Sequence, residues 1–232
     1  MCKRSGRLFG APYSISTSRV AVVLNEKNIE YALRIVDTSN RGLRILKNEH
    51  KDSRYIALNP FGKTPLFQDH EVTMYESRAI IRHIAQKHDE HGPHLYGTSE
   101  KERAMVDQWL EVESQNFNPA IAPAVYQLVF AAWFGKIGDM RIVNPSIERL
   151  EKVLDVYEGQ LMRTKFLAGD SVSIADLSHL PFTYYLVEHA GRDDIFFKRP
   201  HVQNWWTSIF NRPSWTSHLL KAYPKIYFNS HA

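Results

Sequence analysis

The chain has 232 residues, 44% of them hydrophobic, which is enough apolar material for one large or two modest domains and excludes a disordered chain. Its formal net charge is +4, and Lys and Arg are scattered between acidic residues without a dense basic face, which disfavours nucleic acid as a partner. The single cysteine, Cys2, excludes an internal disulfide and a cysteine-based zinc site and fits a reducing compartment, so we expect a cytoplasmic protein.

The first 87 residues alternate short strands and helices. The first expected elements are a strand at 7–10 and a helix that is entered through the turn at 11–19 and ends at 26–28. Strands at 31–36, 64–68 and 72–75 and a helix at 76–86 are expected to follow. This β-α-β-β-β-α order, with a mixed sheet, predicts an α/β domain of thioredoxin-like fold over 1–87. A thioredoxin-type redox function is excluded, because no cysteine lies near the turn before the first helix.

Three hydroxyl groups crowd the beginning of the first helix, those of Ser14, Ser16 and Thr17. At least one of them is expected to cap the helix, because a Ser or Thr hydroxyl accepts a hydrogen bond from the second or third helical N–H. The hydroxyls that do not cap remain available for chemistry.

Two later stretches together indicate a ligand site. The segment 59–65, N-P-F-G-K-T-P, taken alone is a turn before a strand, but a proline after Thr64 is a candidate cis peptide that leaves the preceding backbone open as a hydrogen-bonding edge. Glu76 and Ser77 then begin a helix whose N–H groups and positive dipole end favour a carboxylate. A peptide-binding edge beside an anion-binding helix end implies a small acidic peptide.

A polar segment at 88–98 reads as a linker, and its histidines have no carboxylate or cysteine partners at ligand spacing, so no metal is expected there. Beyond it, apolar residues recur at helical spacing and predict an all-α domain over 99–222, followed by a loose tail at 223–232. The two expected apolar stripes contain Met105, Trp109 and Val112, and Ile147, Leu150, Leu154, Tyr157 and Leu161.

The window from Ser114 to Gly135 carries no charged residue and is long enough to span a bilayer. It also contains asparagines and prolines, which make a buried helix pair or a pocket wall the better interpretation, so we expect no membrane span. Further on, Ser173 and Asp176 have the spacing of a capping box, which makes Asp176 structural rather than a general base.

These motifs resemble the glutathione S-transferases. The stretches N-P-F-G-K-T-P and E-S-R-A-I are similar to their glutathione-binding half, and P-Y-S-I-S-T-S-R-V, at 12–20, resembles the phi class, a plant-centred group that uses a serine. The resemblance covers most of 7–222. It is weakest at 38–48, where the basic residues have no family role to transfer.

The resemblance implies a role for each motif. Ser14 would be the catalytic hydroxyl, with Ser16 as the less favoured alternative, and glutathione would be the cosubstrate without a covalent cofactor or a metal. The implied glutathione-binding residues are Ser14, His50, Lys51, Lys63, Thr64, Glu76 and Ser77. The expected acceptor pocket consists of Tyr13, Ile15, Phe117, Tyr126 and Tyr185. Phe61, an aromatic in a polar turn, would insert into a second subunit and make a homodimer.

The implied reaction is attack of the glutathione thiolate on a hydrophobic electrophile, or reduction of an organic hydroperoxide, in detoxification and stress response. One alternative is a ligandin-type carrier that holds apolar molecules without turnover. Another is a transferase-shaped interaction module. The module is disfavoured because it has no need to keep the hydroxyl turn, the basic pair and the Glu-Ser pair together.

Overall fold

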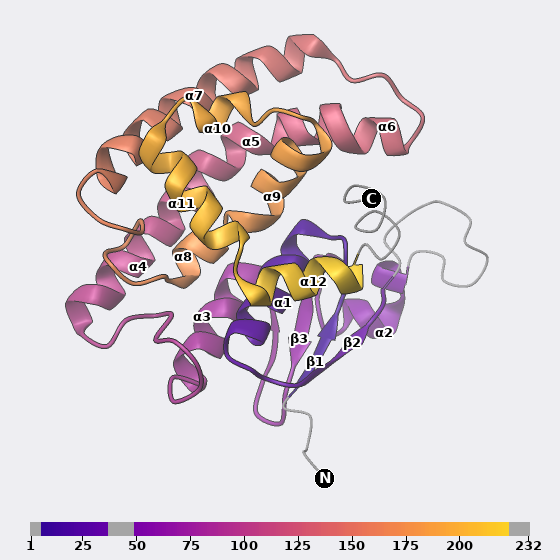
Figure 1. The fold of residues 1–232 in the computed structure, drawn as a ribbon. Helices are drawn as coiled ribbons and strands as arrows, with labels where there is room; N and C mark the ends of the chain where they lie inside the picture. The colour runs from indigo at the N-terminus through magenta and orange to yellow at the C-terminus, as the bar shows by residue number, and fades with distance from the viewer. Residues whose placement is uncertain (1–5, 37–48, 223–232) are drawn as a thin grey trace. The chain divides into compact units, whose positions relative to one another are not determined.

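The computed structural model describes residues 6–36 and 49–222 (Figure 1). Three features discussed above lie outside these residues: Cys2, the loop 38–48 and the tail 223–232.

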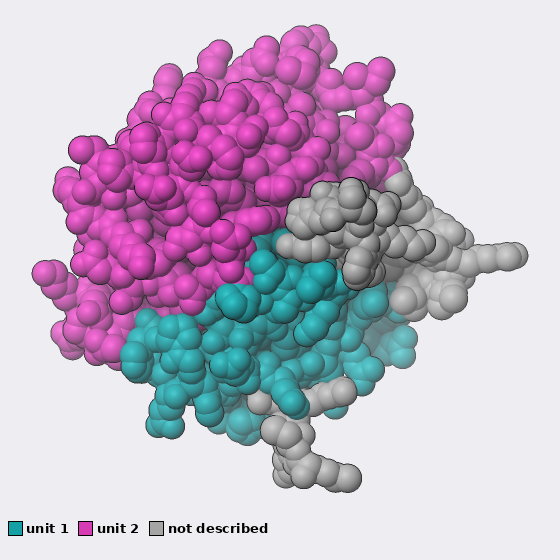
Figure 2. Space-filling view, viewed as in Figure 1, with its two compact units in different colours: residues 1–94, 213–232 teal, residues 95–212 magenta. Residues whose placement is uncertain are grey.

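The chain forms two compact units, shown in separate colours in Figure 2. Residues 1–94 and 213–232 make up the first unit, and residues 95–212 make up the second. The boundary after 94 falls inside the predicted linker, 88–98. The helical domain predicted over 99–222 ends earlier, because the last helix, α12 (Pro213–Ala222), packs against the first helix of the first unit.

Within the described residues, the first unit contains a mixed four-stranded sheet in the order β2-β1-β3-β4 (Figure 1). Its strands are β1 (Gly6–Phe9), β2 (Tyr31–Arg34), β3 (Leu66–Gln68) and β4 (Thr73–Tyr75). β1 is parallel to β2 and antiparallel to β3, which is antiparallel to β4. Leu8 and Leu66, on the two central strands, are completely buried. The predicted thioredoxin-like α/β fold is confirmed.

The register of the sheet brings three chain segments to one edge. Phe9, at the end of β1, is opposite Leu66, at the start of β3, and Leu66 is opposite Tyr75, at the end of β4. Because these neighbours are antiparallel, the residues after Phe9, before Leu66 and after Tyr75 all leave the sheet at the same end. The hydroxyl turn, the Thr64-Pro65 bond and the Glu76-Ser77 pair therefore share one edge.

The helices of the first unit are α1 (Ile15–Glu26), α2 (Ser53–Ile56), α3 (Ser77–Lys87) and α12. α1 contains a run of β-branched residues, which have modest helix propensity, so its stability comes from packing against α3 and α12. Val20, Val22 and Val23 are accordingly completely buried. α3 buries Ile80 and Ile84 on one face, as predicted from their spacing.

The second unit is helical. Its helices are α4 (Glu100–Val112), α5 (Asn118–Val125), α6 (Ala131–Trp133), α7 (Met140–Leu161), α8 (Ile174–Leu177), α9 (Leu180–Tyr184), α10 (Asp194–Phe197) and α11 (Pro200–Phe210). Wider π-helical turns at Glu113–Phe117 and Tyr126–Phe130 join α4, α5 and α6. Within 6–36 and 49–222, none of the helices combines the length and the hydrophobicity that a bilayer crossing requires.

The apolar stripe predicted for α7 is confirmed, since all five of its predicted residues are buried. The stripe predicted for α4 is confirmed at Trp109 and not at Met105 or Val112. The residues buried there are Val106, Trp109 and Leu110, whereas Met105 and Val112 are only partly covered. Both sets have helical spacing, and packing within the unit decided between them.

Asp176 joins three segments of the helical unit. One carboxylate oxygen, Oδ2, accepts hydrogen bonds from the main-chain N–H and the hydroxyl of Ser173, at 2.9 and 2.8 Å. The other, Oδ1, accepts from the N–H of Leu167 at 3.0 Å and from Nε1 of Trp205 at 2.9 Å. The carboxylate is completely buried. The predicted capping box is confirmed, and Asp176 also attaches α11 through its hydrogen bond with Trp205.

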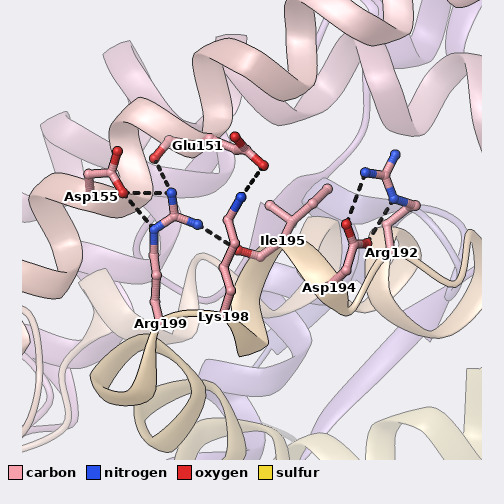
Figure 3. A network of polar contacts seen from close by, with 7 residues as sticks. All are labelled: Glu151, Asp155, Arg192, Asp194, Ile195, Lys198 and Arg199. Atoms are coloured by element: carbon pink, nitrogen blue, oxygen red, sulfur yellow. Dashed lines mark hydrogen bonds and ion pairs between the residues drawn. The ribbon is translucent and has the colours of Figure 1, made fainter.

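A second polar network, drawn in Figure 3, attaches the region between α10 and α11 to α7. Arg199 donates to the carboxylate of Asp155 at 2.6 and 2.8 Å, and to the carbonyls of Ile195 and Glu151 at 2.8 and 3.0 Å. Lys198 pairs with the Glu151 carboxylate. These contacts satisfy the guanidinium of Arg199, which is largely buried, and fix the start of α11.

Candidate functional site

Ser14 occupies the N-cap position of α1 with an extended backbone, φ −72° and ψ 129°, but its side chain makes no capping bond. The turn is closed by main-chain groups instead. The Ser14 N–H donates to the Ala11 carbonyl at 3.0 Å, and the Ser18 N–H donates to the Ser14 carbonyl at 2.8 Å. The expectation that Ser14, Ser16 or Thr17 caps the helix was wrong, and the Ser14 hydroxyl lies half-buried at the start of α1 without capping it.

The next hydroxyls along α1 point elsewhere. Thr17 is completely buried against Gly10, where an added Cβ would lie 2.2 Å from Thr17 Oγ1, so only glycine lets β1 turn into α1 here. Ser16 is two residues after Ser14, about 200° further around a helix axis. One helix end therefore cannot present both hydroxyls to the same ligand atom, and the N-cap position favours Ser14.

The 59–65 segment is a turn fixed by its own side chains. Asn59, buried, accepts a hydrogen bond from the Phe61 N–H at 3.1 Å and donates to the Lys63 carbonyl at 2.7 Å. The Tyr55 hydroxyl donates to the same carbonyl at 2.8 Å. Burial raises the pKa of Tyr55 to about 12, so this hydroxyl remains a donor at physiological pH. The Thr64-Pro65 peptide is cis, as predicted, and Thr64 precedes the paired residues of β3.

The predicted basic residues lie around this turn. Gly62 has φ +53°, and an added Cβ would lie 2.9 Å from the His50 carbonyl, so the segment with His50 and Lys51 packs directly on the turn. Lys51 Nζ lies 3.4 Å from the Gly62 carbonyl. Lys51 and Lys63 are exposed, and His50 is half-buried. The structure therefore places Lys51 beside the turn that contains Lys63, with His50 next to it in the chain, and positively charged side chains there suit a carboxylate.

Glu76 precedes α3 with φ 68° and ψ 105°, a backbone conformation that residues other than glycine rarely adopt. Such strained residues concentrate at ligand sites, where surrounding contacts hold them in place. Its side chain is exposed and does not cap α3. The conformation supports a binding role for this residue at the helix end.

Ser77, the first residue of α3, is buried and accepts a hydrogen bond from Arg19 Nη1 at 2.9 Å. Arg19 comes from α1 and is only 1% exposed. Arg19 was not predicted as a site residue. Its place in the motif P-Y-S-I-S-T-S-R-V was the one sequence signal that could have marked it as important. The motif does not indicate its partner, which is 58 residues away. Arg19 connects the helix that carries Ser14 to the helix that begins with Ser77.

The predicted acceptor residues differ in exposure. Tyr13, in the first unit, is 39% exposed, whereas Ile15 is buried. In the second unit Tyr126 is 54% exposed, and Tyr185 is almost completely buried. Phe117 has no exposed surface, since its ring stacks on Tyr157 and meets His179 edge-on. Phe117 was predicted as a pocket wall residue and is a core residue of the helical unit.

No group of three or more His, Cys, Asp or Glu side chains in the described part of the chain is arranged to hold a metal ion. The His94 ring lies 3.0 Å from the Asp89 carboxylate, in the linker.

Comparison with known proteins assigns both units. Residues 8–93 match the glutathione S-transferase N-terminal domain, and residues 127–213 match the C-terminal domain. Glutathione S-transferase F10 of Arabidopsis thaliana is 41% identical over 205 residues, which are 88% of this chain and 92% of that protein.

Solved structures agree with this assignment. Glutathione transferase F7 from Populus trichocarpa is 42% identical, with a TM-score of 0.86 over 94% of this chain and 99% of that one. Maize glutathione S-transferase I, solved in complex with an atrazine glutathione conjugate, is 32% identical, with a TM-score of 0.85 over 95% and 99%. The chain described here belongs to the glutathione S-transferase family and, within it, to the phi class.

Proposed function

We propose that this protein binds glutathione at the edge of its sheet and that Ser14 donates a hydrogen bond to the glutathione thiolate. The observation that carries this proposal is the Ser14 hydroxyl, which stands at the N-terminus of α1 and makes no capping bond to it. The same edge carries the strained Glu76 and the basic turn.

The chemistry follows from the ionisation of the thiol. An ordinary thiol has a pKa of about 8.5 and is mostly protonated at neutral pH, whereas the thiolate is the nucleophile. A hydroxyl donor and the positive end of a helix both stabilise the thiolate, and each unit by which the pKa falls corresponds to about 1.4 kcal/mol. The thiolate then forms a carbon–sulfur bond to the electrophile, and the leaving group departs with its electron pair.

The ends of the tripeptide fit the charges at this edge. Glu76 and the N-terminus of α3, with Ser77, suit the γ-glutamyl end, which carries an amino and a carboxylate group. Lys51 and Lys63, with His50, suit the glycyl carboxylate. The main chain at Thr64, outside the β3 ladder, suits the cysteinyl backbone.

We infer a hydrophobic electrophile as the acceptor. The maize relative was solved with an atrazine conjugate, which supports substituted aromatic heterocycles as one acceptor class. Tyr13, the residue before Ser14, is 39% exposed and is the aromatic side chain proposed to contact it. The single cysteine of the chain fits a reducing compartment, and we propose that the protein works in the cytoplasm as a homodimer.

The test compares Ser14→Ala with Ser16→Ala in conjugation of glutathione to chlorodinitrobenzene. Loss of a hydrogen bond to a charged group costs about 1.5–3 kcal/mol, so Ser14→Ala should lower kcat about 10- to 100-fold. Calorimetry should find nearly unchanged glutathione affinity, and Ser16→Ala should remain close to wild type. A greater loss in Ser16→Ala would move the assignment, and a wild type that binds glutathione but turns over no electrophile or hydroperoxide would favour a carrier.

A further inference from the structure

A chain of polar contacts connects the last helix of the first unit to the turn that carries Ser14. Ser18 Oγ donates to the Pro12 carbonyl at 2.9 Å, and Nε2 of His218, on α12, lies 2.9 Å from the same Ser18 Oγ. Ser18 is 2% exposed and His218 is 3% exposed. Neither side chain was given a role in the site described above, and both are polar groups held away from water, where each must be satisfied by a partner.

The direction of each hydrogen bond follows from the number of protons. Ser18 has one hydroxyl hydrogen, and it is directed to the Pro12 carbonyl. Ser18 Oγ must therefore accept the bond from His218, so Nε2 is the protonated nitrogen of the neutral ring. His218 therefore donates to Ser18, and Ser18 donates to the Pro12 carbonyl. Both donors in this chain of hydrogen bonds have an acceptor.

Ser18 also holds the turn at a second point. Its N–H donates to the carbonyl of Ser14 itself, at 2.8 Å, while its hydroxyl holds Pro12, two residues earlier. Ser18 thus holds both ends of the 12–14 segment, Pro12 through its hydroxyl and Ser14 through its N–H. The peptide groups of this segment set the direction of the Ser14 side chain. Hydrogen bonds weaken steeply with misalignment, so a small rotation of this turn would weaken the bond from Ser14 to a thiolate.

α12 has a separate attachment to α1 at its first turn, one turn before His218. Ser214 donates its hydroxyl to the Glu26 carboxylate, and its carbonyl accepts from Asn25 Nδ2 at 3.0 Å. These contacts dock α12 on the C-terminal end of α1, away from the Ser14 turn. His218 is therefore not needed merely to hold α12 in place, and its contact with Ser18 can be tested separately.

We propose that His218 and Ser18 are positioning residues, which hold the Pro12–Ser14 turn so that the Ser14 hydroxyl is aligned with the sulfur of glutathione. This inference rests on the proposed function of Ser14. The role of His218 is to orient Ser18 by donating to it, and the role of Ser18 is to fix the turn. Neither residue touches the substrate.

The test measures the pKa of glutathione bound to each variant from the ultraviolet absorbance of its thiolate, together with kcat and KM across pH. In His218→Leu and Ser18→Ala we expect the bound thiol pKa to rise and kcat near pH 6.5 to fall about 3- to 10-fold. The deficit should shrink toward pH 9, where the thiol ionises without help. The KM for glutathione should change less than about twofold, since binding groups are intact.

Two further variants separate positioning from simple loss of packing. His218→Gln keeps an N–H donor near the position of Nε2 and should restore most of the thiol pKa and rate. Ser214→Ala removes the attachment of the first turn of α12 to the C-terminal end of α1 and should lower thermal stability without changing the thiol pKa. If His218→Leu does not fold, Ser18→Ala carries the same measurement with the imidazole intact.

The inference is overturned if folded His218→Leu and Ser18→Ala keep the wild-type thiol pKa, or if their deficit is equal at every pH. It is also overturned if Ser214→Ala shifts the thiol pKa as much as they do. A wild type without conjugating activity, or a Ser14→Ala variant with wild-type kcat, would instead contradict the proposed function and this inference together. An active enzyme that Ser14→Ala impairs and His218→Leu does not would remove this inference alone.

Discussion

Glu76 holds a backbone conformation with φ 68° that costs a non-glycine residue of order 1–3 kcal/mol. It stands immediately before α3, whose first residue, Ser77, is fixed by Arg19. The strained backbone conformation lets the chain turn from β4 into the helix, and the carboxylate of Glu76 is left exposed at the helix end. We interpret the strain as part of the proposed glutathione site, since no packing in the core requires a carboxylate here.

A pair of substitutions at Glu76 separates strain from binding. Glu76→Gly relieves the positive φ and removes the carboxylate, so we expect unchanged or higher stability together with a KM for glutathione raised about 10-fold. Glu76→Ala should raise KM equally but be about 1 kcal/mol less stable than the glycine variant. Urea denaturation and steady-state kinetics measure the two effects, and an unchanged KM in both variants would contradict the placement of the site.

His218 should make the stability of the fold depend on pH. Burial lowers its pKa from 6.5 to about 4, the Pro12 carbonyl opposes this shift, and Lys221 adds to it. The unfolded chain therefore takes up the proton first, so the contribution of neutral His218 is complete above pH 6.5 and is lost as pH falls toward 4. A shift of this size corresponds to about 3 kcal/mol.

The measurement is the free energy of unfolding of wild type and His218→Gln between pH 7 and pH 4. Wild type should lose about 3 kcal/mol more than the variant over this range, because glutamine does not titrate. Titration of the acidic residues is common to both proteins and cancels in the difference. Two parallel stability curves would show that His218 is not the titrating group.

At the scale of elements, α1 is a helix without a side-chain cap, and its stability comes from packing. Its valines are covered by α3 and α12, and Arg19 and Ser18 satisfy their polar groups on partners from those same two helices. A helix held by its neighbours can leave its first turn open for a ligand, where a cap would otherwise compete. The helix forgoes the stabilising hydrogen bond of a Ser14 cap, and the Ser14 hydroxyl is left available for the proposed chemistry.

α8 shows the opposite arrangement, with a fully satisfied cap. Asp176 accepts four hydrogen bonds, from Ser173, Leu167 and Trp205. Asp176→Ala leaves these buried donors without an acceptor, so we expect a loss of about 2–4 kcal/mol in the free energy of unfolding. Ser173→Ala should lose only about 0.5–2 kcal/mol.

Conjugation per folded molecule is the control for this prediction, and it should be unchanged in both variants. An Asp176→Asn protein that folds fully, by near-ultraviolet circular dichroism, yet does not conjugate glutathione would make the acid catalytic instead of structural.

At the scale of the whole molecule, the exposed aromatic side chains bear on assembly. Phe61 is 62% exposed, with its ring edge-on to Tyr75 at 5.8 Å. Its turn is rigid, because Asn59 and Tyr55 fix both sides of it. An aromatic ring held outward on a rigid turn is a suitable anchor for a second subunit, which supports the proposed homodimer.

Phe61→Ala should weaken this dimer. Truncation of one buried aromatic anchor commonly costs about 2 kcal/mol or more, equivalent to about a 30-fold rise in the dissociation constant, and a homodimer loses the anchor of both subunits, so the rise should exceed about 30-fold. Light scattering across a dilution series measures the change, with Phe134→Ala as a control, since Phe134 is a similarly exposed aromatic, 54%, with no proposed role in assembly. A monomeric wild type at micromolar concentration, or a Phe61→Ala dimer as tight as wild type, would exclude this contact.

The sequence by itself determined the features that local patterns encode. Hydrophobic periodicity predicted the strands, α3 and α7, because burial of one face imposes a spacing that can be counted along the chain. The turn at 59–65 and the capping box at Ser173 and Asp176 were predictable because their partners are a few residues apart. The motifs also located Ser14 and the Glu76-Ser77 pair as candidates.

Only the tertiary structure decided the contacts between distant residues. His218 meets Ser18 across 200 residues, and Arg19 meets Ser77 across 58, and neither pair has a periodic signal. The burial of Phe117 likewise depends on packing against Tyr157 and His179, which are remote in sequence. Local patterns state which residues can form an element, but the competition among neighbours for each buried surface determines what each side chain contacts.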